Sequence, residues 1–176
     1  ESVLDLCNAA LATPDIGLSP VQERLLATQT HSIRAICCLH LQRIDDAIQS
    51  AIIGFDALRD HALPVGLNAM SAAVLGRLRP KNELEEIVSE RLSHQPTPTA
   101  LAWLSIARAE CVAARGDMAS ASAILGSATP TSSEGFPSFG LAMIEWIFGL
   151  YERLGEVPPA TLIRNAIQLN QEQLKE

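Results

Sequence analysis

The stretch from Thr99 to Pro130 reads TALAWLSIARAECVAARGDMASASAILGSATP and contains the best-formed structural unit in the chain. It predicts two helices that fold back on each other across Arg115-Gly116-Asp117. The first helix carries apolar or small residues along its length, and the second places Ala121, Leu125 and Ala128 on one face at helical spacing. Because facing small residues let two helix backbones approach closely, we expect a tight helical hairpin rather than a catalytic loop.

The composition of the chain favours a single all-α domain. Its 176 residues are 48% hydrophobic and only 4% aromatic, so aliphatic side chains and close backbone contacts must fill the core. The net charge is −7 and no cluster of Lys or Arg stands out, which argues against direct binding to nucleic acid or to an anionic membrane. The four cysteines lack the spacing of a disulfide framework or a zinc site.

The longest apolar run, Leu141 to Tyr151, is interrupted by Glu145 and is shorter than the ~20 residues that span a bilayer. No basic segment followed by an apolar core opens the chain. Together with the reduced cysteines, these features predict a cytoplasmic protein. The same apolar run could be either buried or the contact face of a homodimer.

Cap and turn signals divide residues 1–176 into about nine helices with no convincing strand. Ser19-Pro20 and Thr97-Pro98 combine a capping side chain with proline at the first helical position, which marks two helix starts. Thr129 to Ser138 is the longest irregular stretch. We expect an N-terminal helix over 2–12 and four hairpins at approximately 19–60, 64–94, 97–128 and 138–174, all within one domain.

Small residues recur at matching places in successive hairpins. Ala109 precedes Ala121 by 12 residues, Ala35 precedes Ala47 by 12, and Ala109 follows Ala35 by 74, which is twice 37. The midpoint falls on Ala72, with Leu84 12 residues later. The last hairpin fits with a two-residue slip, through Phe148 and Ala160. A helix–turn–helix period near 37 predicts a stacked α-solenoid, and an irregular helical bundle is the alternative.

The third hairpin carries the pattern A-x6-G-D-M-x2-A-x3-L-x2-A from Ala109 to Ala128, and a weaker copy runs from Ala35 through Arg43-Ile44-Asp45-Asp46 to Ala47. On these residues the chain resembles the tetratricopeptide repeat (TPR) family, including its degenerate versions in bacterial signalling and transcription-activator proteins. The resemblance implies a right-handed superhelix of antiparallel hairpins that binds partners in a concave groove. Leu84 departs from the pattern, which usually has alanine there.

No catalytic motif is visible. The chain has no Gly-rich phosphate loop, no GxSxG elbow and no HExxH pattern, so we expect no enzyme activity and no cofactor. Cys37 and His40 lie three residues apart on one helical face, but two ligands do not make a zinc site, and we expect no metal.

The repeat register predicts which side chains line the groove formed by the first helix of each hairpin. We expect a non-catalytic interaction or regulatory module that binds a peptide or helix of a protein partner, within a larger bacterial signalling or transcription-control protein. The alternative is a small-ligand sensor that signals through the C-terminal helix to an output domain. For Trp103, packing between hairpins is the alternative role. The candidate partner-binding residues are Trp103, Glu110, Arg77, His40, Glu145 and Arg153.

Overall fold

The computed structural model describes residues 2–13, 17–60, 63, 65–94, 96–128 and 140–173. Over these residues the chain forms nine α-helices and two short 3-10 helices, with no strand, which confirms the all-α prediction. The predicted loop from Thr129 to Ser138 lies outside the described residues. The α-helices are α1 (Val3–Ala12), α2 (Pro20–His40), α3 (Ile44–Asp56), α4 (Ala69–Leu78), α5 (Asn82–Ser93), α6 (Pro98–Ala114), α7 (Met118–Ala128), α8 (Gly140–Leu154) and α9 (Ala160–Gln173). The 3-10 helices are η1 (Ala57–Arg59) and η2 (Gly66–Asn68).

The helix starts that the sequence predicts from capping side chains are confirmed. Ser19 accepts a hydrogen bond from the backbone N–H of Gln22, whose side chain in turn accepts from the backbone N–H of Ser19, and Pro20 follows as the first residue of α2. Thr97 caps α6 in the same way, by accepting from the N–H of Ala100.

The start of α4 differs from the sequence prediction, which began the second hairpin at about residue 64. The α-helix begins only at Ala69, after the 3-10 turn η2. Gly66 has a φ of +40°, which lies outside the right-handed helical region, so a regular helix cannot run through it.

Three of the four first helices of the hairpins are followed by a residue in the left-handed conformation. Gln42, Gly116 and Gly155 follow α2, α6 and α8 in the left-handed conformation, with φ of 58°, 87° and 70°. After α2 the N–H of Arg43 reaches back to the carbonyl of Cys38 at 2.8 Å, as in a Schellman motif. Gln42 and Gly116 are 74 residues apart, twice the predicted period. At the midpoint, Arg79 is non-helical (φ −145°, ψ 60°) because the proline that follows it disfavours a helical conformation.

The register positions of the first three hairpins all lie in the core. Their side chains are at most 4% exposed, which indicates that the matching small residues sit where the paired helices touch. In the last hairpin Phe148 is only partly buried and Ala160 is exposed, so the two-residue slip does not place them equivalently. The buried set is Ala35, Ala47, Ala72, Leu84, Ala109 and Ala121.

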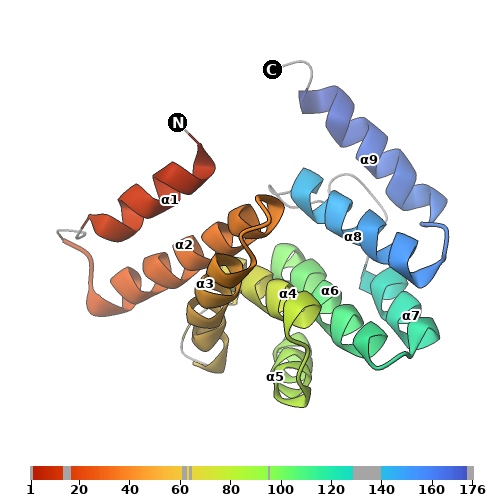
Figure 1. The fold of residues 1–176 in the computed structure, drawn as a ribbon, viewed down its shortest axis with the longest axis horizontal. Helices are drawn as coiled ribbons and strands as arrows, with labels where there is room; N and C mark the ends of the chain where they lie inside the picture. Colours follow the sequence, from red (N-terminus) through yellow and green to blue (C-terminus); the bar gives the residue numbers. More distant parts are fainter. Residues whose placement is uncertain are drawn as a thin grey trace.

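The first helices of the hairpins form a row across the molecule. α2 contacts α4, α4 contacts α6, and α6 contacts α8. α3, α5 and α7 lie along the lower side of this row, and α1 and α9 lie at its two ends, so the chain forms an open arc (Figure 1). α4 and α6 approach each other closely at Gly76, where an added Cβ would lie 2.8 Å from the carbonyl oxygen of Ala107. This arrangement is compatible with a helical repeat fold.

The apolar face of α8 is buried within the chain. Met143, Ile147 and Leu150 are at most 2% exposed, because they pack into the main core with α6. The first of the two predicted roles for this run, burial, is therefore the one that the structure shows. A homodimer stays a prediction that would need another surface.

Candidate functional site

Two neighbouring surface pockets lie where the first helices of the hairpins meet. The first, of about 370 Å³, is lined by α4, α6, the start of α7 and α8, and the second, of about 250 Å³, by α2, the start of α3, α4 and α8. They share Arg77 and Leu78, so we treat them as one groove, the Arg77 groove. Of the six candidate residues, Arg77, Glu110 and Arg153 line the first pocket, and His40, Arg77 and Glu145 line the second. The structure thus brings five of the six together from four helices.

Glu110 forms the polar centre of the first pocket. The residue is 5% exposed, and its Oε1 accepts a hydrogen bond of 2.9 Å from the indole Nε1 of Trp146 and an ion-paired hydrogen bond from the guanidinium of Arg153. A buried carboxylate needs such partners because it has lost its water. Glu110 therefore joins α6 to two positions of α8, and its contacts are made within the chain.

Arg77 lies at the boundary between the two pockets. Its guanidinium carbon is 5.3 Å from the centre of the Trp146 ring, at cation–π distance. Partial burial lowers the pKa of Arg77, the positive charge of Arg153 lowers it further, and Glu110 acts in the opposite direction. Within the described part of the chain, the Arg77 guanidinium forms no hydrogen bond or ion pair. Its N–H groups are therefore available to a ligand.

His40 and Glu145 border the second pocket. Both are exposed. His40 lies in the last turn of α2, where a histidine side chain can interact favourably with the negative end of the helix dipole. Leu39, Ile44 and Trp146 supply apolar surface beside them. This part of the groove combines an apolar base with polar groups at its edge.

Trp103 does not reach the surface of the groove. It is fully buried at 0% exposure, and its ring meets that of Trp146 edge-on, with the centroids 5.9 Å apart and an interplanar angle of 86°. The structure therefore shows the alternative role that the sequence left open, packing between hairpins. Trp103 supports the groove by holding Trp146 in place, and a partner on this surface cannot contact its side chain.

The sequence analysis did not single out Trp146, although this residue contacts Arg77, Glu110 and Trp103. Its neighbour Glu145 was chosen by repeat register alone. A tryptophan next to a predicted groove position is a weak signal in the sequence. Whether Glu145 or Trp146 faces α6 depends on how α8 packs on α6. Other apolar residues that line the first pocket, and that sequence reasoning did not identify, include Leu78, Met118, Leu150 and Leu154.

The described residues do not assemble a metal centre, since no group of three or more His, Cys, Asp or Glu side chains among them could hold an ion. The four cysteines are free thiols. Burial raises the pKa of Cys7, Cys37 and Cys38, and raises the pKa of Cys111 to about 11. These thiols are therefore protonated at neutral pH, which makes them poor nucleophiles.

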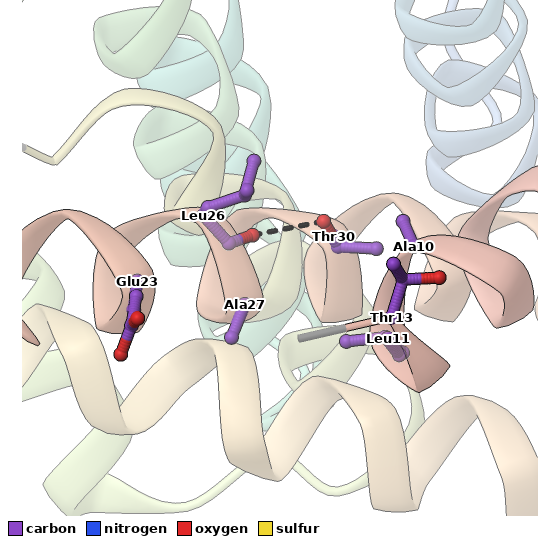
Figure 2. Close-up of a pocket in the computed structure, with 7 residues that line it drawn as sticks. All are labelled: Ala10, Leu11, Thr13, Glu23, Leu26, Ala27 and Thr30. Atoms are coloured by element: carbon purple, nitrogen blue, oxygen red, sulfur yellow. Dashed lines mark hydrogen bonds between the residues drawn. The ribbon is translucent and has the colours of Figure 1, made fainter. Parts of the chain in front are cut away.

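A third pocket, of about 230 Å³, lies between α1 and α2 (Figure 2). Its lining is mostly small or apolar, and the hydroxyl of Thr30 is used within α2, where it donates to the carbonyl of Leu26 at 2.8 Å. Glu23 is the one charged side chain among the described residues that line this pocket, so these residues offer much less chemistry than those of the Arg77 groove.

Comparison with known proteins assigns no family to the chain. No protein-family model matches it, and neither the curated proteins nor the solved structures contain a significant match. Among the helices in the described parts of the chain, none has the length and apolarity needed to cross a membrane. The functional proposal therefore depends on the geometry of the groove.

Proposed function

We propose that this chain is a non-catalytic, TPR-like interaction module that binds a peptide or helix of a protein partner in the Arg77 groove. The observation that carries the proposal is the convergence of His40, Arg77, Glu145 and Arg153 from α2, α4 and α8 on two adjoining pockets. Residues so far apart in the sequence meet only because the first helices stack side by side. A row of this kind offers a preformed surface, which lowers the entropic cost of binding a segment.

The buried register positions support the TPR-like reading. In the first three hairpins the equivalent small residues are in the core, and the turns after α2 and α6 repeat at twice the predicted period. By the resemblance to degenerate TPR proteins, we further propose that the module serves a larger bacterial signalling or transcription-control protein, in the cytoplasm.

A selection from a phage-displayed library of random peptides tests the groove directly. Peptides enriched on the wild-type protein should bind the Arg77→Glu and Arg153→Glu variants at least about tenfold more weakly, because each substitution replaces a groove side chain and reverses its charge on the surface that faces the ligand. Arg164→Glu is the matched control, since Arg164 is an exposed arginine of α9 that lines neither pocket. Circular dichroism establishes that each variant is folded.

The proposal is wrong if the enriched peptides bind Arg77→Glu and Arg153→Glu as tightly as they bind the wild type. A selection that enriches no peptide sequence also counts against it.

A further inference from the structure

Among the described residues, the first pocket of the Arg77 groove holds one more positive than negative charge, and the carboxylate of Glu145 lines the second pocket. The first pocket contains two guanidinium groups, Arg77 and Arg153, and one carboxylate, Glu110. That carboxylate is already engaged by Arg153 and Trp146. Although the whole chain has a net charge of −7, this part of the groove is therefore locally cationic. A partner group that carries a negative charge would complete it.

The guanidinium of Arg77 is suited to a carboxylate in particular. The guanidinium lies over the Trp146 ring, 5.3 Å from the ring centre, and this cation–π contact restricts the side chain without using its N–H groups. A planar fork of donors matches the two oxygens of a carboxylate and forms the stronger, charge-assisted kind of hydrogen bond. Because Arg77 is already held by the ring, little side-chain entropy remains to be lost on binding.

The place of Arg77 in the groove distinguishes an internal side chain from the end of a chain. Apolar surface lies on both sides of it, from Leu150 and Leu154 in one pocket and from Leu39 and Ile44 in the other. A C-terminal carboxylate on Arg77 would leave one of these pockets empty. A segment that continues past the carboxylate fills both.

We propose that the Arg77 groove recognises an acidic side chain in the interior of a partner segment, with an aliphatic residue on each side of it. The acidic side chain binds Arg77, with the charge of Arg153 nearby, and the aliphatic residues occupy the two pockets. This inference rests on the proposed function, because it specifies the ligand of the same groove.

Synthetic peptides of defined composition test the acidic preference. The probe is a fluorescein-labelled, acetylated and amidated helical peptide on an Ala/Lys/Gln background, with leucine one helical turn before and after a central position. That position carries Glu, Gln or Lys, and a fourth peptide ends there with a free carboxylate. Fluorescence polarisation should give an affinity for the Glu peptide at least about tenfold higher than for the Gln peptide. The Lys peptide and the chain-end peptide should bind more weakly than the Glu peptide.

Two variants of the protein separate recognition by Arg77 from a general charge effect. In Arg77→Gln the affinities for the Glu and Gln peptides should differ by no more than about twofold, because the guanidinium group that binds the carboxylate is gone. Arg79→Gln removes the same charge two residues away, at an exposed position outside both pockets, and should keep the advantage. In the wild type the advantage should shrink as the salt concentration rises, since exposed charges are screened.

A third variant, Ala114→Trp, distinguishes the failure of this inference from the failure of the proposed function. Ala114 is an exposed residue in the wall of the first pocket, so an indole there obstructs the groove. If the Glu and Gln peptides bind equally well and Ala114→Trp abolishes their binding, the acidic preference is wrong but the docking groove remains supported. If Ala114→Trp does not change the binding, or if none of the four peptides binds, both the acidic preference and the docking groove are wrong. Tighter binding of the chain-end peptide would overturn the internal placement.

Discussion

Replacing Glu110 by alanine should destabilise the protein far more than replacing it by glutamine. Glu110 and Trp146 are 5% and 4% exposed, and the bond between them is 2.9 Å. In Glu110→Ala the buried indole N–H loses its acceptor, which costs about 1–3 kcal/mol, and one buried methylene group is lost at about 0.8 kcal/mol. Arg153 is 40% exposed and can turn to water, so its lost ion pair adds less than about 1 kcal/mol. The expected total is about 3 kcal/mol.

Glu110→Gln keeps an oxygen that can accept from the Trp146 indole and loses only the charge. We therefore expect it to cost about 1 kcal/mol. For a chain of this length the alanine variant should melt roughly 6–12 °C lower than the wild type, and the glutamine variant roughly 2–4 °C lower.

Urea unfolding followed by circular dichroism measures the three free energies, and tryptophan fluorescence follows the same transition because Trp103 and Trp146 are the only two tryptophans. Glu145→Ala is the control. It removes an exposed carboxylate one residue from Trp146 and should change the stability by less than about 0.5 kcal/mol. If Glu110→Ala matched Glu110→Gln, the indole hydrogen bond would not be the source of the stability and the reasoning would be refuted.

Three further predictions concern the packing and the ionisation of other elements. In urea unfolding, Gly76→Ala should destabilise the protein by about 1–2 kcal/mol, because the added Cβ would press on the α6 backbone. Gly149→Ala should instead stabilise it by about 0.5–1 kcal/mol, because a Cβ added there meets no neighbouring atom within 4 Å. Equal changes in the two variants would contradict this reasoning. At pH 8 the Cys111 thiol, with its pKa raised to about 11 by burial, should react with a disulfide reagent far more slowly in the native than in the unfolded protein. The hydrogen bond from Arg115 lowers the pKa of Glu85 from its ordinary value of 4.5, so the stability from this pair is present above pH 4.5 and is lost as the pH falls through the folded-state pKa. Arg115→Ala should accordingly lower the urea midpoint at pH 7 and approach the wild type in acid.

Local signals in the sequence predicted the helices well, because capping chemistry is a short-range effect. Ser19-Pro20 and Thr97-Pro98 define the starts of α2 and α6. The start of α4 was wrong, since the left-handed φ of Gly66 depends on how the connecting turn packs beside α2. A glycine in the sequence shows that such a conformation is available and does not show that it is used.

The site was predictable only where a side chain's direction follows from repeat register. Arg77 and Arg153, near the ends of α4 and α8, lie at the groove as expected. Trp103 does not, because α6 is surrounded by α4, α5, α7 and α8, and both the groove side and the opposite side of this helix are covered. The periodicity of α6 alone cannot tell which of its large residues reach the surface. Trp146 acquires its role through tertiary contacts with α6, which no local pattern in α8 contains.

The shape of the groove bears on the choice between a docking module and a small-ligand sensor. A small molecule is usually held with most of its surface buried, whereas Arg153 keeps 40% of its side chain exposed and Arg77 also faces solvent. None of the three pockets described above has a lining residue from α9, so a ligand in any of these three would not touch the helix that the sensor model requires to move. A partner segment that spans both pockets gains contact area on each side of Arg77, which a compact ligand in one pocket cannot do. The geometry therefore favours the binding of a macromolecular segment.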